Sequence, residues 1–331
     1  MAIRQKPAPD LTRFNGKTRL MHITPRLVLV LTVPPLMWAG NAVIGRMVVG
    51  SIGPLWLNAL RWLVAFAFLL PLGWRSLATP EARAQVTSRW RYLAVLTLFG
   101  VGAYNALQYT ALLTSTPLNV TLIASSSPVW TMAIGALAYG MRPSRLQLAG
   151  AALSLAGVAL VLSRGMPGSL LTIQLVQGDL LILLAIIGWS IYSWMLARPP
   201  AHMSGTTRPA WNWAEFLLVQ CAFGVCWAVA AAAVGDLVAP PAATQWSWTV
   251  LLAILFMAIG PSIVAYWLWG LAVQEAGPAI AAIFYNLTPL FAALLSAAST
   301  GEWPKPYHGL AFALIVAGIT VSSRSLPKRV Q

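Results

Sequence analysis

Long apolar runs alternate with short polar connections along the chain from residue 27 onward. The run at 146–162 contains no charged residue, and the run at 178–197 contains a single acid, in its first turn. A helix needs about 20 apolar residues to cross about 30 Å of hydrocarbon, so these runs predict an all-α polytopic membrane protein. We expect ten spans, at 27–45, 54–72, 92–112, 118–139, 146–163, 178–197, 214–235, 247–272, 278–299 and 306–322.

Composition supports a membrane protein. Of the 331 residues, 59% are hydrophobic and only 8% are charged. An average soluble domain is about 45–50% apolar and about 25% charged, so this chain lacks the polar residues that a water-soluble surface requires. The net charge of +14 comes from basic residues scattered between the apolar runs, without the basic stripe and interleaved aromatic residues of a nucleic-acid interface. The lipid bilayer is therefore an expected partner, and nucleic acid is not.

The basic residues predict the orientation. If ten spans place both termini in the cytoplasm, seventeen basic residues lie on the cytoplasmic side, and only Arg46, Arg164 and Lys305 lie outside. Such an excess is typical of cytoplasmic segments of inner-membrane proteins. The sequence thus predicts a bacterial inner-membrane protein with a disordered basic cytoplasmic tail at 1–26 and a second cytoplasmic tail at 325–331.

The chain contains an internal repeat, with one copy at 27–164 and the other at 178–324. Each copy contains five expected spans. Because five is odd, the second copy must enter the membrane in the opposite sense. Inverted repeats related by an axis in the membrane plane recur in transporters, with the substrate site near the midplane between the halves. In each copy a proline is followed twelve residues later by a glycine, at Pro128 and Gly140 and at Pro289 and Gly301.

Small residues recur at helical spacing in the last span of each repeat. They are expected to allow close contact between helices, which packing stabilises in lipid. These residues are Gly150, Ser154 and Gly157 in the first repeat and Gly309, Ala313 and Ala317 in the second.

Three motifs occur in order along the chain: Trp38-Ala39-Gly40-Asn41 followed by Arg46, then Leu60-Arg61-Trp62, then Pro289 followed by Gly301-Glu302, Gly309 and Ala317-Gly318. Together they resemble the drug/metabolite transporter superfamily, specifically its duplicated ten-helix EamA-type exporter family. The resemblance covers about 27–324 and implies export of small metabolites, with amino acids, including aromatic ones, among the substrate classes. The chain departs from the pattern in the first repeat, where Met141 occupies the position of Glu302.

Polar side chains inside the expected spans are candidates for the transport pathway, because burying them in lipid is costly. Arg61 lies near the middle of the second span with no acid in any span centre to pair with. It anchors a substrate carboxylate, or it bonds helix-end carbonyls, or the span boundary differs and Arg61 lies near an interface. We hypothesise that a central cavity binds a zwitterion between aromatic walls; the alternative for each residue is interhelical packing. The predicted substrate-binding residues are Trp38, Asn41, Arg61, Tyr104, Asn105, Gln108, Trp189, Tyr285 and Asn286.

The titratable residues favour a particular mechanism. All seven acids lie in tails, loops or the outermost turns of spans. Proton-coupled carriers keep an ionisable group inside the bundle, so uniport or exchange by alternating access is expected, with proton coupling as the alternative. No base lies near 125–127 to activate a serine, so an enzyme is not expected, and neither is a metal or cofactor site. A non-transporting membrane scaffold and the oligomeric state stay open, and a monomer is compatible with the sequence.

Overall fold

The computed structural model describes residues 24–48, 50–111, 113–115, 117–238, 243–300 and 305–324. These residues form helices and short connections, with no strand among them. Most of the predicted N-terminal tail, all of the predicted C-terminal tail, and Glu302 lie outside the described residues. The first helix begins at Pro25, two residues before the expected start.

The first repeat forms five helical runs. The first two are single helices, whereas the third contains a π-helical segment and the fourth is interrupted by a turn at 125–126. The elements are α1 (Pro25–Met47), α2 (Pro54–Gly73), the short α3 (Arg75–Ala78) and α4 (Pro80–Thr87), α5 (Trp90–Thr97), η1 (Leu98–Ala103), α6 (Tyr104–Ala111), α7 (Pro117–Ala124), α8 (Ser127–Tyr139) and α9 (Arg145–Leu162).

The second repeat has the same irregularities in the same order. Its third run again contains a π-helical segment, and its fourth is again interrupted, at Asn286. After the 3₁₀ helix η2 (Pro167–Thr172) come α10 (Gln177–Ala197), the 3₁₀ helices η3 (Ala201–Met203) and η4 (Gly205–Thr207), α11 (Trp213–Val238), α12 (Trp248–Met257), η5 (Ala258–Val264), α13 (Ala265–Glu275), α14 (Pro278–Tyr285), α15 (Leu287–Thr300) and α16 (Pro306–Ser323).

Nine helical runs of the described residues are long and apolar enough to span a bilayer. The remaining run, 90–111, is the expected third span, and its polar side chains Tyr104, Asn105 and Gln108 lower its mean hydropathy. Together these runs form the ten-helix, all-α fold that the sequence predicts.

Local signals explain where several spans begin and end. Thr24 caps α1 by accepting a hydrogen bond from the Leu27 amide at 3.2 Å, and Pro25 follows it at the first helical position. Ser144 and Gln147 form a reciprocal capping box at the start of α9. Gly140 ends α8 with a φ of 64°, in the left-handed region that glycine adopts without steric cost.

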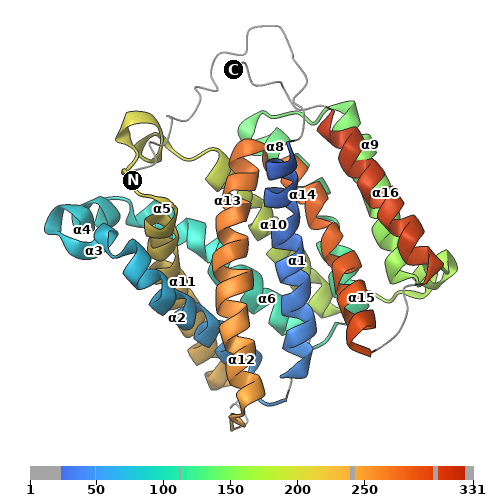
Figure 1. Ribbon diagram of the computed structural model, residues 1–331, viewed down its shortest axis with the longest axis horizontal. Coiled ribbons are helices and arrows are strands. Elements are labelled where there is room, and N and C mark those ends of the chain that lie inside the picture. The colour runs from blue at the N-terminus through green and yellow to red at the C-terminus, as the bar shows by residue number, and fades with distance from the viewer. Residues whose placement is uncertain are drawn as a thin grey trace, which may run out of the picture.

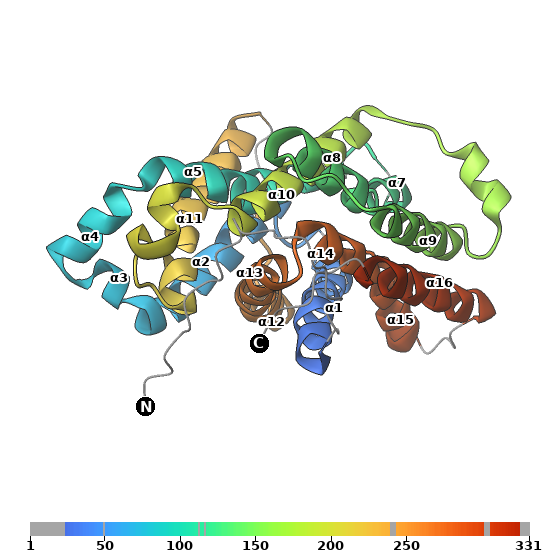
Figure 2. The ribbon, with the colours of Figure 1, turned by 90° about the horizontal axis from the view of Figure 1, so that it is seen from above.

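The two repeats pack with pseudo-two-fold symmetry (Figures 1 and 2). The second spans, α2 and α11, pair at one side of the bundle, and the fifth spans, α9 and α16, pair at the other. In the centre, α1 packs on α13 and the equivalent α10 packs on α6 and η1. The first span of each repeat thus contacts the third span of the opposite repeat, so the middle of the molecule is an interface between the halves.

The pairing of α9 with α16 depends on two facing glycines. A Cβ at Gly318 would lie 2.5 Å from the Gly150 carbonyl oxygen, and a Cβ at Gly150 would overlap the Gly318 carbonyl oxygen in turn. The predicted contact at Gly150, Ser154 and Gly157 is therefore present. The predicted contact in the last span was wrong, because Gly309, Ala313 and Ala317 face outward; the residues of α16 that face α9 are Ala311, Ile315, Gly318 and Ser322.

Candidate functional site

Two tryptophans meet at the centre of the bundle, one from each repeat. Trp38 of α1 and Trp189 of α10 lie edge to face, with 5.2 Å between ring centroids and 89° between planes. Both residues lie near the middle of their helices. Tyr104 packs on Trp189 at 5.3 Å, and Tyr285 packs on Trp38 at 5.7 Å. The hydroxyls of Tyr104 and Tyr285 are hydrogen-bonded at 2.9 Å, so the structure brings all four predicted aromatic residues together.

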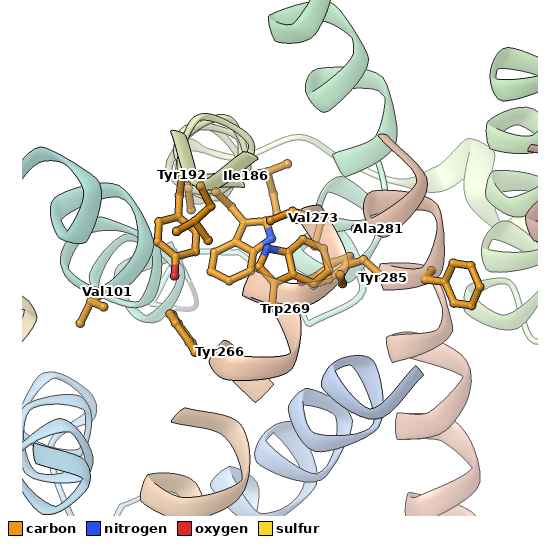
Figure 3. Close-up of a cluster of buried hydrophobic side chains, with 14 of the residues drawn as sticks. Val101, Ile186, Tyr192, Tyr266, Trp269, Val273, Ala281 and Tyr285 are labelled. Atoms are coloured by element: carbon orange, nitrogen blue, oxygen red, sulfur yellow. The ribbon is translucent and has the colours of Figure 1, made fainter. Parts of the chain in front are cut away.

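Three further aromatic residues complete this cluster (Figure 3). The rings of Tyr192, Tyr266 and Trp269 lie 5.1, 5.6 and 5.3 Å from Trp189. The sequence hypothesis missed them, although the internal repeat contained a signal, because Ala265-Tyr266 matches Ala103-Tyr104 in the other half. We call these seven residues, Trp38, Tyr104, Trp189, Tyr192, Tyr266, Trp269 and Tyr285, the central aromatic cluster.

Hydrogen bonds to backbone carbonyls hold two rings of the central aromatic cluster, those of Tyr266 and Trp38. The Tyr266 hydroxyl donates to the Gly100 carbonyl at 2.6 Å, where the π-helical segment η1 changes the register of the backbone. Trp38 Nε1 donates to the Pro261 carbonyl in the equivalent segment η5, at 3.2 Å. Each π-helical segment therefore presents a carbonyl to an aromatic side chain from the other repeat. Irregular backbone of this kind is common at functional sites of helices.

The cluster is packed and not hollow. Trp189 is only 3% exposed, and its neighbours contact it directly. A hollow of about 370 Å³ lies away from the cluster, between α8 and α9, and is lined by apolar side chains such as Met132 and Leu155. The halves are thus in a closed arrangement at their centre, and a substrate would enter only if they separate.

Arg61 lies close to Asn41. Its guanidinium donates to Asn41 Oδ1 at 3.2 Å, linking α2 to α1, and the residue is only 3% exposed. Among the described residues Arg61 has no ion pair; Asp236, the acid at the end of α11, accepts from Trp56 Nε1 instead, at 2.8 Å. Arg61 is therefore a buried cation without a counter-charge from the described protein.

The three remaining predicted residues differ in their surroundings. Asn105 is buried, and its Nδ2 has no hydrogen-bond partner in the described structure. Gln108 is half-buried on the same helix. Asn286 is fully buried, and its Nδ2 donates to Ser154 Oγ at 3.1 Å, so its amide faces α9 and not the aromatic rings.

Polar links close the interface between helices at both ends of the bundle. At one end, Arg26 at the start of α1 donates both terminal nitrogens to Glu275 at the end of α13, at 3.0 and 3.1 Å. At the other end, Asp179 in the first turn of α10 accepts from Ser115 Oγ and, at 2.9 Å, from Asn119 Nδ2. The two links occupy equivalent places, because α10 and α1 are the first spans of the two repeats.

The comparison with protein-family models decides the family. The model described as the EamA-like transporter family matches residues 26–163 and matches again at residues 176–324. The chain belongs to the EamA-like transporter family. This EamA-like protein is accordingly a membrane transporter of the drug/metabolite transporter superfamily, as the motifs predict.

Relatives of the EamA-like protein are transporters as well. It is 26% identical over 305 residues to an uncharacterized transporter of Archaeoglobus fulgidus, covering 92% of this chain and 98% of the relative. It is 26% identical to the inner membrane transporter YedA of Escherichia coli, covering 86% and 87% of the two chains. With its nine strongly apolar helices among the described residues, the EamA-like protein is a multi-pass protein of the bacterial inner membrane.

One relative has a named substrate class, and one solved structure matches the fold. The aromatic amino acid exporter YddG of Ancylobacter novellus is 24% identical over 278 residues, covering 83% of this chain and 89% of its own. A crystal structure that is 20% identical superposes with a TM-score of 0.68, covering 90% of this chain and 97% of its own. That likeness shows the same fold.

Proposed function

We propose that this transporter exports small metabolites, foremost amino acids with aromatic or other neutral side chains, by alternating access between its two repeats. The observation that carries the proposal is the contact of Trp38 with Trp189 at the interface between the halves. Aromatic faces bind rings and apolar side chains, and the neighbouring Arg61 supplies positive charge for a carboxylate. The similarity to an aromatic amino acid exporter supports the same substrate class.

The polar links at the two ends support alternating access. Arg26 with Glu275 and Asp179 with Ser115 each join the start of a first span to the opposite part of the bundle. A carrier needs one such closure to open while the other holds, so that the central site faces one side at a time. In the described arrangement both are formed, which fits an occluded state.

An export assay tests the proposal. Cells that overproduce the transporter should lower their internal pool of phenylalanine, tyrosine or tryptophan and resist toxic aromatic analogues, compared with cells that carry the empty vector. Alanine replacement of Asn41 and Gln108 should reduce this export, and so should replacement of Asn286 if its amide turns into the pathway when the halves separate. Unchanged export by all three variants at normal expression would reject this assignment of the pathway.

Energy coupling is part of the proposal, and we propose uniport or exchange. The two buried carboxylates of the described residues, Asp179 and Glu215, both lie in the first turn of a helix and accept from backbone amides, of Val176 at 2.8 Å and of Asn212 at 2.7 Å. A carboxylate held by capping bonds has a structural role that explains its burial. Purified transporter in liposomes should exchange labelled substrate without moving protons. A fixed ratio of protons to substrate, lost on Asp179→Asn, would favour the proton-coupled alternative.

A further inference from the structure

Helix α2 carries three buried polar atoms that have no hydrogen-bond partner in the described structure. These are Asn58 Oδ1, Arg61 Nε and Trp62 Nε1. Asn58 and Trp62 are each 1% exposed. Asn58 lies three residues before Arg61 and four before Trp62, so it shares a face of α2 with each of them. The Arg61 guanidinium lies over the Trp62 ring, 5.4 Å from its centroid, so the three side chains are neighbours. We call this group, together with Asn41, the α2 polar face.

Unpaired polar atoms at such depth need an explanation. A buried donor or acceptor without a partner costs roughly 1–3 kcal/mol, and more when the group is charged. The α2 polar face contains three such atoms within two helical turns. Protein side chains relieve this cost only in part, through the hydrogen bond from Arg61 to Asn41 and the contact of the Arg61 guanidinium with the face of the Trp62 ring, 5.4 Å from its centroid. A ligand that supplies the missing partners would relieve it.

The chemistry of the face selects an anion. Arg61 Nε and Trp62 Nε1 are donors, and a guanidinium presents its donors in a planar fork that matches a carboxylate. The charge of Arg61 is not balanced by any acid among the described residues. A ligand carboxylate would therefore satisfy the two donors and balance the charge of Arg61, whereas the guanidinium would repel an ammonium. The third unpaired atom, Asn58 Oδ1, is an acceptor and takes no part in this contact.

The position of the face indicates what else the ligand carries. The Trp62 ring lies edge to face against Tyr266, 4.9 Å between centroids and 87° between planes. Tyr266 belongs to the central aromatic cluster, so the α2 polar face and the cluster are adjacent. A molecule with a carboxylate at one end and a ring at the other would span both.

We propose that the α2 polar face is a carboxylate-binding subsite, and that the transporter recognises aromatic carboxylates whether or not they carry an ammonium group. This inference rests on the proposed function and narrows its substrate class. The described residues around the central aromatic cluster offer amides, hydroxyls and rings to an ammonium but no carboxylate partner. The carboxylate is thus the recognised end of the substrate.

Calorimetric titration of the purified transporter in detergent tests the inference with three ligands that share a phenyl ring. Phenylalanine has both charged groups, 3-phenylpropionate lacks the ammonium, and phenethylamine lacks the carboxylate. The wild-type protein should bind the first two with affinities within about tenfold of each other and should bind the amine at least about tenfold more weakly, since a hydrogen bond to a charged group contributes about one to two powers of ten in affinity.

Titration of variants then tests whether Arg61 binds the carboxylate. Arg61→Gln should lose at least about tenfold in affinity for both carboxylates. Arg61→Lys keeps the positive charge but not the planar set of donors, so its affinity for the carboxylates should lie between those of Arg61→Gln and the wild type. Arg46→Gln, at the exposed end of α1, is the matched control and should bind like the wild type. If Arg61→Gln does not fold, the affinities of the wild-type protein for the three ligands and the carboxylate affinity of Arg61→Lys still test the subsite.

Each outcome is decisive. Equal binding of phenethylamine and 3-phenylpropionate, or unchanged carboxylate affinity in a folded Arg61→Gln protein, would overturn the subsite while leaving the proposed export intact. Binding of none of the three ligands would overturn the proposed substrate class. The export assay in cells reports on the transport function independently of these titrations, so the two failures are distinguishable.

Discussion

At the scale of single residues, the tightest constraint is the approach of α9 to α16 at Gly150 and Gly318. A side chain at either position would meet backbone of the other helix, which cannot move aside alone. Gly150→Val should therefore destabilise the protein by about 1–3 kcal/mol, the usual cost of overpacking a filled interface. The loss should appear as a lower melting temperature of the detergent-solubilised protein.

The control lies on the same pair of helices. A Cβ at Gly309 would meet no atom within 4 Å, so Gly309→Val adds a branched side chain without a clash. Its melting temperature should equal that of the wild type or exceed it. An equal loss in both variants would mean that glycine flexibility, and not close contact, explains the result.

Residue types could be predicted from the sequence more reliably than the faces they occupy. Trp38, Trp189, Tyr104 and Tyr285 could be identified because aromatic and polar residues in a span are conspicuous. Trp269 was missed because spans seven and eight contain four tryptophans, Trp227, Trp248, Trp267 and Trp269, and only tertiary packing shows which of them turns inward. The outward position of Gly309 has the same origin, since an almost uniformly apolar helix such as α16 has no polar face to indicate its orientation.

At the scale of elements, the link between α1 and α13 should control one end of the pathway. Glu275→Gln removes the ion pair with Arg26, which is largely exposed, and such pairs contribute up to about 1 kcal/mol. Hydrogen–deuterium exchange at the start of α1 and the end of α13 should accelerate by up to severalfold. The double variant Arg26→Glu with Glu275→Arg should restore protection; if it does not, the charge pair is not the cause.

The hydrogen bonds of Asp179 at the other end of the bundle lead to the equivalent prediction for that end. Asp179→Asn weakens the bonds from Ser115 and Asn119 to a buried carboxylate, and bonds to charged groups contribute about 1.5–3 kcal/mol. Exchange at the start of α10 and the end of α6 should accelerate about tenfold or more, with the Arg26 end unchanged. Faster exchange over the whole protein would indicate general unfolding instead of a gate.

Element boundaries were predictable where local signals exist and not where tertiary contacts decide. Spans begin close to the expected residues because prolines and capping residues such as Thr24 and Ser144 stop or start helices locally. The π-helical segments at 98–103 and 258–264 were not predicted, because one extra residue per turn leaves no mark on a pattern of apolar residues. Their matching positions become visible only when both repeats are compared in space.

At the scale of the whole molecule, inversion of the repeats accounts for the pairing of equivalent helices across the centre. The odd number of spans in each repeat could be read from the chain, and it requires opposite insertion. Whether the interface between the repeats is closed or open could not be predicted from the sequence, because both arrangements use the same helices. The packed Trp38 and Trp189 show that the described arrangement is closed at its centre.

The orientation of the molecule in the membrane follows from the same topology and can be measured. Helix α10 separates η2 from η4, so Ser169 and Thr207 lie at opposite ends of the bundle, and both are exposed. The excess of basic residues predicts that the Thr207 end lies in the cytoplasm. In a background with both native cysteines, which are free thiols, replaced by alanine, an impermeant maleimide should label Ser169→Cys in intact spheroplasts. It should label Thr207→Cys only after lysis. The reverse pattern would mean that the orientation is opposite to the predicted one, with the fold unchanged. Labelling of both cysteines from the same side would mean that α10 does not cross the membrane, and this would contradict the inverted insertion of the two repeats.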